Sequence, residues 1–187
     1  MNKQAAEKQL KKTLTPQRYN HTLGVIKAAL QLAEHFHISK ENAYWAALLH
    51  DCAKNIGKQE TKDLLQQHHI QLDAITDANK ALIHAVTGAL MAEDIYGIQN
   101  ADILNAIRYH TTGRAKMSPL EKIIFISDMI EEGRKFPGVE NIRNTLTNNL
   151  NQGVLEGLAQ SISFVLSKKQ LLHPDSVAAW NDLIQQI

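Results

Sequence analysis

The stretch Ala43-Tyr44-Trp45-Ala46-Ala47-Leu48-Leu49-His50-Asp51 joins an apolar run to an imidazole and a carboxylate at its end. The run predicts a buried helix that begins after a cap at Ser39. Because an uncompensated buried charge is costly, His50 and Asp51 must be neutral, paired or bound to a metal. Lys54 follows in the short sequence H-D-C-A-K. The stretch therefore predicts a helical core with a polar site at the end of one helix.

Helical signals recur along the whole chain, without strand alternation or an internal repeat. Thr15-Pro16 and Ser118-Pro119 each read as a cap followed by proline at the first helical position. The segment Phe136-Pro137-Gly138-Val139 is predicted to be a loop, either a lid or a rigid turn. The predicted helices cover 16–33, 40 to a stop at 55–57, 61–69, 77–96, 101–109, 119–128, 142–169 as one helix or two, and a last helix from 174 that is capped by Asp175 or Ser176. We predict one all-α domain over residues 1–187.

Composition excludes several classes of protein. The 20 basic and 19 acidic residues give a net charge of +1, which argues against a nucleic-acid partner bound through a broad basic surface. The single Cys52 suits a reducing compartment. The N-terminus has no apolar signal region, and no apolar stretch approaches the roughly 18 residues of a membrane span. We therefore expect a cytoplasmic protein without a membrane partner, and the apolar last helices are compatible with a homodimer.

Four further residues are candidates for the same site as His50-Asp51. His21, His84 and His110 lie on apolar helix faces, and Asp128 follows the apolar run Ile123-Ile124-Phe125-Ile126. Taken singly, each histidine fits a satisfied core position and the acid fits a solvated helix end. Their recurrence near the ends or inner faces of several helices favours a shared metal site. Imidazoles and carboxylates suit iron, manganese, zinc or cobalt better than calcium or magnesium.

Five ordered motifs resemble a known family. They are Arg18-Tyr19-Asn20-His21, then H-D-C-A-K, His84-Ala85-Val86-Thr87-Gly88, Tyr109-His110-Thr111-Thr112-Gly113 and S-D-M-I-E-E-G-R-K-F-P-G-V. The order resembles the HD-domain superfamily of metal-dependent phosphohydrolases and, within it, the bacterial YqeK family. The resemblance extends from Arg18 to the H-P-D-S-V-A-A-W segment. Met129 and Glu132 depart from the family pattern beside Asp128, where they alter the shape of the loop rather than the chemistry.

The resemblance implies an HD-domain helical bundle that hydrolyses diadenosine tetraphosphate symmetrically. Water would attack one inner phosphorus atom, and the central bridging oxygen would leave with one of the two ADP products. The cofactor would be iron, as one ion or as a dinuclear centre bridged by Asp51, with other divalent transition metals as alternatives. The expected metal ligands are His21, His50, Asp51 and Asp128.

The same resemblance implies roles for other residues. The expected catalytic group is Asp51, Lys54, His84, His110 and Arg134. Nucleotide binding would involve His21, Asp51, Lys54, His84, His110, Thr111, Asp128, Arg134, Leu172 and His173. Arg18 would act on the substrate or only brace Asp51 or a loop. Three alternatives remain at this point: another HD-type nucleotidase or phosphodiesterase, a di-iron oxygenase, and a non-catalytic nucleotide-binding helical domain.

Overall fold

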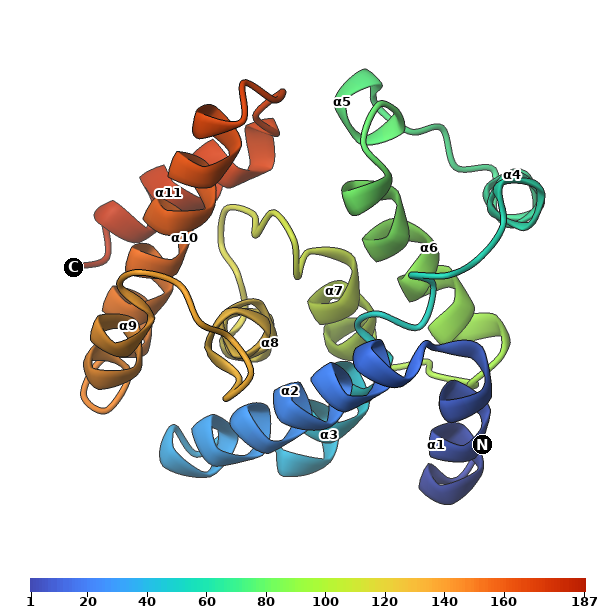
Figure 1. Ribbon diagram of the computed structural model, residues 1–187, viewed down its shortest axis with the longest axis horizontal. Helices are drawn as coiled ribbons and strands as arrows, with labels where there is room; N and C mark the ends of the chain where they lie inside the picture. The colour runs from blue at the N-terminus through green and yellow to red at the C-terminus, as the bar shows by residue number, and fades with distance from the viewer.

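The computed structural model describes residues 1–187, which form helices and no strand. The eleven helices are α1 (Lys3–Thr13), α2 (Pro16–His35), α3 (Lys40–Leu49), α4 (Lys58–Gln67), α5 (Ala74–Asp77), α6 (Lys80–Asp94), α7 (Ala101–Arg108), α8 (Pro119–Ile130), α9 (Val139–Thr145), α10 (Leu150–Ser167) and α11 (Pro174–Ile184). Helix α8 lies in the middle and packs against α2, α3, α7 and α10, with α9–α11 on one side and α4–α6 on the other (Figure 1). The prediction of an all-α fold is confirmed.

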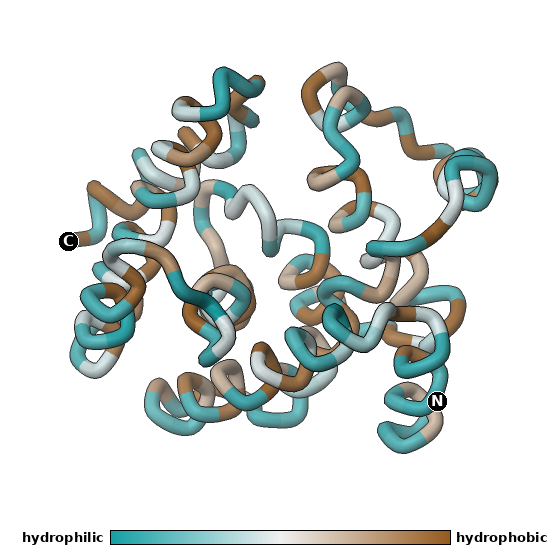
Figure 2. The backbone as a smooth tube through the Cα atoms, in the orientation of Figure 1, coloured by the Kyte–Doolittle hydropathy of each residue, from teal (hydrophilic) through white to brown (hydrophobic).

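One continuous core of 36 buried residues connects the helices, from Ala6 in α1 to Leu183 in α11. Helix α8 is the most enclosed, because every residue from Leu120 to Ser127 is buried. Helix α4, by contrast, buries no residue and is largely hydrophilic (Figure 2). The enclosure of α8 explains how Asp128, the next residue along it, reaches the interior. None of the helices combines the length and apolarity that a membrane crossing requires.

The predicted caps of three helices are confirmed. Thr15, Ser39 and Ser118 each accept a hydrogen bond from the backbone N–H three residues further on, at 3.2, 3.2 and 3.1 Å. Such a bond satisfies one of the N–H groups that a helix start leaves without a partner. These caps set where α2, α3 and α8 begin, and each of the three helices carries or directly precedes a residue of the site described below.

Helix α3 ends earlier than expected. It stops at Leu49 rather than at 55–57, and residues 50–55 form tight turns. The Cys52 N–H donates to Leu49 O and the Lys54 N–H donates to Asp51 O, so the hydrogen-bond spacing shortens from four residues to three. His50 and Asp51 therefore stand on a tight turn, from which both side chains reach the interior.

Other predicted boundaries also need correction. The helix expected over 77–96 begins at Lys80, because Asp77 ends the short α5 and Asn79 caps α6. The segment 142–169 is two helices, the second of its two predicted forms, with Asn149 capping α10, but α9 begins earlier than expected, at Val139 within the predicted loop. The predicted cap of the last helix at Asp175 or Ser176 is wrong, since the cap is His173, whose Nδ1 accepts from the Asp175 N–H at 3.1 Å.

Helix α1 was not predicted at all. It is rich in Lys, Gln and Glu and buries only Ala6 and Leu10. Two apolar positions one turn apart are a weak periodic signal in a polar segment. Its docking against the rest of the chain is visible at the Tyr44 hydroxyl, which donates to Glu7. The side chain of Lys3 also donates to Glu41 at 2.5 Å.

Candidate metal centre

Six polar side chains from separate parts of the chain converge in the interior, at the face of the core bounded by α2, α3, α6, α7 and α8. All of them are buried or nearly so, although their positions span more than 100 residues of sequence. They are His21 on α2, His50 and Asp51 after α3, His84 on α6, His110 after α7, and Asp128 on α8. The structure thus brings together all six residues of the predicted shared site.

The carboxylate of Asp51 lies at the centre of this cluster. Its Oδ1 is 2.9 Å from His84 Nε2 and 3.8 Å from His110 Nε2. Its Oδ2 is 3.5 Å from His50 Nε2 and 4.0 Å from His21 Nε2. Two groups with metal-ligand spacing therefore share one carboxylate, namely His21–His50–Asp51 and Asp51–His84–His110.

Backbone carbonyls orient two of the imidazoles. His50 Nδ1 lies 2.7 Å from Ala47 O, and His110 Nδ1 lies 2.7 Å from Ile107 O. A carbonyl can only accept, so Nδ1 carries a proton in both rings, and Nε2 keeps its lone pair whenever the ring is neutral. In both cases the free Nε2 faces Asp51. A metal ligand requires this tautomer and this orientation.

Several atoms at the centre have no hydrogen-bond partner. They include His21 Nε2, His50 Nε2 and Asp51 Oδ1, all fully shielded from solvent. Buried polar atoms are almost always satisfied, so three orphans in one place call for an explanation. A divalent cation among them would satisfy all three at once. The donor set and the orphaned atoms therefore fit a divalent transition metal.

Asp128 approaches the cluster from the side of His21. Its Oδ1 is 2.9 Å from His21 Nε2, and it accepts from Arg134 Nη2 at 2.5 Å. The Nε of Arg134 also donates to the backbone oxygen of Asp128 at 2.7 Å. Arg134 thus closes over the carboxylate from the outer side and brings a positive charge to the rim of the centre.

The protonation states suit metal binding. Burial raises the pKa of Asp51, but the charge of His50 and the close contacts with His50 and His84 hold it well below its ordinary value. The pKa of Asp128 is lowered too, since the contact with His21 and the charge of His50 outweigh its burial. Burial and neighbouring histidines lower the pKa of His110 to about 3. Near neutral pH both carboxylates are charged and His110 is neutral, as ligands must be.

His50 and His84 respond in opposite directions. Burial disfavours the charged form of His50, yet the negative charge of Asp51 raises its pKa. Burial lowers the pKa of His84, an effect that its contact with Asp51 offsets only in part and that the nearby Lys54 reinforces. Without a metal, the charge of Asp51 therefore favours a proton on His50. A bound cation would replace the His50 proton as the counter-charge of Asp51.

Glu131 is a member of the site that the sequence did not reveal. It is only 7% exposed, and its Oε1 lies 3.1 Å from His21 Nδ1. Its Oε2 accepts from the Gly133 N–H at 2.6 Å. The carboxylate holds the outer nitrogen of His21 and so turns Nε2 toward Asp51 and Asp128. The spacing of Glu131 three residues after Asp128 at the end of an apolar helix was the available signal.

Two cations lie against Asp51. Arg18 Nη1 donates to Asp51 Oδ2 at 2.8 Å, which agrees with the bracing role considered for Arg18. Lys54 Nζ is 3.4 Å from Asp51 Oδ1 and 3.1 Å from His84 Nε2. Both side chains remain partly exposed, at 32% and 29%. They connect the buried carboxylate to solvent, where an anionic substrate would arrive.

Three predicted nucleotide contacts lie outside this cluster. Thr111 and His173 line a cavity of about 110 Å³ together with Tyr109 and Asp73. His173 Nε2 contacts Thr76 Oγ1 at 3.2 Å and Asp73 Oδ2 at 3.4 Å. Leu172, next to His173, is partly buried. The cavity is nevertheless linked to the metal centre through the backbone, because Thr111, which lines the cavity, directly follows His110.

A helical fold that gathers histidines and aspartates around a central His-Asp pair defines an HD-type metal-dependent hydrolase. The chain belongs to the HD domain family, whose model matches residues 18–133. This confirms the resemblance that the motifs indicated, and with it the fold class.

The similarity to individual relatives extends over nearly the full length. A protein from Halalkalibacterium halodurans named bis(5'-nucleosyl)-tetraphosphatase, symmetrical, is 41% identical, covering 98% of both chains. A protein of the same name from Bacillus subtilis is 39% identical with the same coverage. A crystal structure from Clostridium acetobutylicum, described as a predicted HD superfamily hydrolase involved in NAD metabolism, superposes with a TM-score of 0.95 at 36% identity and covers 100% of this chain and 99% of its own.

Proposed function

We propose that this protein is a metal-dependent hydrolase that cleaves diadenosine tetraphosphate symmetrically to two ADP. The observation that carries the proposal is the arrangement around Asp51, whose two oxygens face two separate pairs of imidazoles. The substrate class rests on the full-length relatives named symmetrical bis(5'-nucleosyl)-tetraphosphatase. Those names favour an enzyme over a non-catalytic nucleotide-binding domain, and a tetraphosphatase over an oxygenase.

His21, His50, Asp51 and Asp128 would hold the metal, which we propose to be iron. When bound, a divalent metal lowers the pKa of a coordinated water and polarises a phosphoryl oxygen. The group Asp51–His84–His110 offers a second position with the same spacing. It would take a second ion, with Asp51 as the bridge, or hydrogen-bond the phosphates of the substrate.

The other residues would manage the charge of the tetraphosphate. The transition state of phosphoryl transfer spreads negative charge over phosphoryl oxygens, which positioned cations stabilise. Lys54 and Arg134 lie on opposite sides of the carboxylate cluster, against Asp51 and Asp128 respectively. Both are partly exposed and can turn from their carboxylates to an incoming phosphate. Arg18 would keep Asp51 oriented during this exchange.

One nucleoside would lie in the cavity of about 110 Å³ beside His110. We propose that Thr111, Leu172 and His173 contact it. Thr111 directly follows His110, so a ligand in the cavity would extend its phosphates toward the metal centre. His173 is held by Asp73 and Thr76, which makes it a preformed wall rather than a mobile contact.

Four further properties complete the proposal. We expect one domain over residues 1–187, in keeping with the continuous core. We also expect the protein to act in the cytoplasm, in keeping with the single buried Cys52. A homodimer remains a prediction, consistent with the exposed apolar residues Phe164, Leu166 and Ile184 on α10 and α11. Binding to nucleic acid is not expected, given the balanced charge.

Product analysis in isotopically labelled water tests the function. The purified protein, loaded anaerobically with Fe²⁺ or with Mn²⁺, Co²⁺ or Zn²⁺, is incubated with diadenosine tetraphosphate in H₂¹⁸O. Symmetric attack predicts ADP as the sole nucleotide product, with one ¹⁸O atom in half of the ADP molecules. AMP and ATP in equal amounts would show asymmetric cleavage and refute the proposal. The Asp51→Asn variant serves as the control for contaminating hydrolases.

A further inference from the structure

A hollow of about 510 Å³ borders the metal centre on the side away from the His173 cavity. It is lined by Glu132, Arg134, Lys135, Phe136, Pro137, Val139, Glu140 and Arg143. Arg134 belongs both to this hollow and to the centre, since its Nη2 contacts Asp128 Oδ1 at 2.5 Å. The hollow and the metal centre therefore share Arg134.

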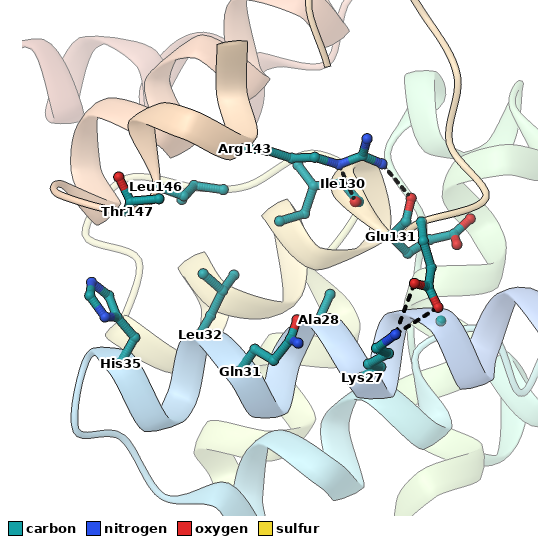
Figure 3. A pocket seen from close by; sticks show the side chains of 12 residues that line it. Lys27, Ala28, Gln31, Leu32, His35, Ile130, Glu131, Arg143, Leu146 and Thr147 are labelled. Carbon is teal, nitrogen blue, oxygen red and sulfur yellow. Dashed lines mark hydrogen bonds and ion pairs between the residues drawn. The ribbon is translucent and has the colours of Figure 1, made fainter. Parts of the chain in front are cut away.

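The turn that forms this hollow is firmly held. Arg143 donates from Nε to Ile130 O at 2.9 Å, and from Nη2 to Glu131 O at 2.8 Å and Arg134 O at 3.3 Å. Figure 3 shows Arg143 reaching across to Ile130 and Glu131. Val139, only 5% exposed, anchors the far end of the turn in the core. Three carbonyls on one guanidinium and a buried anchor make this a rigid turn rather than a lid.

The charges on the hollow are unevenly paired. Glu132 is bound to Lys27, and Glu140 is bound to Arg143. Lys135 is exposed and forms neither an ion pair nor a hydrogen bond with another residue. With both acidic residues paired, the unpaired Lys135 gives the hollow a positive character, to which Arg134 adds although it also contacts Asp128. Phe136 is partly buried and adds an aromatic side chain to the same surface.

The contacts follow an order across the molecule. They lead from the His173 cavity through Thr111 to His110 and His84, then to Asp51. On the other side of Asp51 they continue through His21 and Asp128 to Arg134 and the hollow. The metal centre thus lies between two recesses, one lined by Tyr109 and Arg108 among others, the other by Phe136, Arg134 and Lys135.

A substrate with two identical halves requires two recesses. Symmetric cleavage at an inner phosphorus leaves one nucleoside diphosphate on each side of the reacting atom. We propose that the hollow formed by residues 134–143 binds the second nucleoside diphosphate half of the substrate. Phe136 would stack against its base, as aromatic side chains do with all bases, while Lys135 and Arg134 face its phosphates. The proposal rests on the proposed function and assigns a role to the F-P-G-V segment, which the metal site leaves unexplained.

The test compares a substrate that has two nucleosides with one that has a single nucleoside. Phe136→Ala is expected to lower kcat/KM for diadenosine tetraphosphate roughly 5- to 100-fold, from the usual range of base–aromatic stacking. For adenosine 5'-tetraphosphate, which can leave the hollow without a base, the change should stay within about twofold of the wild type. If that compound is bound without turnover, its inhibition constant is measured instead. Phe164→Ala, at an aromatic side chain 57% exposed on α10, is the matched control and should change neither value.

A second variant guards against misfolding, because Phe136 also packs on the core. Lys135→Glu changes only an exposed side chain and should raise KM for diadenosine tetraphosphate at least fivefold through repulsion of the phosphates. Equal losses on both substrates in Phe136→Ala, or an unchanged KM in Lys135→Glu, would overturn the proposal. Wild-type protein that fails to produce ADP at all would instead refute the proposed function, so the two failures can be told apart.

Discussion

Replacement of Glu131 by Gln should weaken metal binding although Glu131 reaches no proposed ligand position itself. The carboxylate accepts at both oxygens, at 3.1 Å from His21 Nδ1 and 2.6 Å from Gly133 N. A glutamine amide has only one acceptor atom, so one of these two contacts must be lost. If the amide NH₂ group faces His21, Nδ1 becomes the acceptor and the proton moves to Nε2, where it blocks the lone pair that a metal needs.

The size of the effect follows from this tautomer exchange. Substitution of residues that orient a metal-bound histidine typically costs 10- to 100-fold in metal affinity. We expect a rise of that size in the Kd of the metal for Glu131→Gln, which corresponds to about 1.4 to 2.8 kcal/mol. Gly24→Ala should act in the same direction, because a Cβ atom at Gly24 would lie 2.6 Å from Glu131 Oε2 and displace the carboxylate.

The Kd is measured by competition of Mn²⁺ or anaerobic Fe²⁺ with a chelator of known affinity. Thermal unfolding of the metal-free proteins shows whether the variants fold like the wild type. Glu132→Gln is the matched control, since Glu132 is 67% exposed, pairs with Lys27 and does not contact His21. Equal affinities for Glu131→Gln, Glu132→Gln and the wild type would refute the orienting role of Glu131.

Three other predictions follow from the same structure. Asp51→Asn should remove metal from the purified protein and lower kcat at least about 100-fold, and retention of full metal content and turnover would exclude Asp51 as a ligand. Leu10→Ala should lower the free energy of unfolding by about 2 to 4 kcal/mol in urea titration, because Leu10 is fully buried. Lys11→Ala, at an exposed position of the same helix, should change it by under about 0.5 kcal/mol. Similar values for the two variants would show that α1 does not dock. The Cys52 thiol is 2% exposed and its burial raises its pKa to about 12, so a thiol reagent at pH 8 should label it only on unfolding, and rapid labelling of the native protein would contradict its burial.

Local signals accounted for much of the fold. The caps at Thr15, Ser39 and Ser118 were predictable because a cap involves residues only three positions apart. The cap at His173 was missed because it uses an imidazole nitrogen rather than a hydroxyl or carboxylate. Helix α1 was missed because its stability comes from docking two side chains rather than from its own sequence.

Much of the candidate site was also predictable. Polar residues at the ends or inner faces of apolar helices are rare enough to be noticed, and Asp51 and Asp128 stand in such positions. Glu131 could not be distinguished in the same way. It lies beside the exposed Glu132, and two adjacent glutamates look alike until one of them is found buried against His21.

The sequence by itself determined which ligand types the chain carries and the order in which its helices present them, because both depend on local chemistry. Only the tertiary structure decided that one oxygen of Asp51 faces His84 and His110 while the other faces His50 and His21. It also decided that Arg134, two residues before the F-P-G-V turn, contacts Asp128 and so brings that turn near the metal centre. These relations depend on how distant helices pack against α8, and packing is a property of the whole core rather than of any one segment.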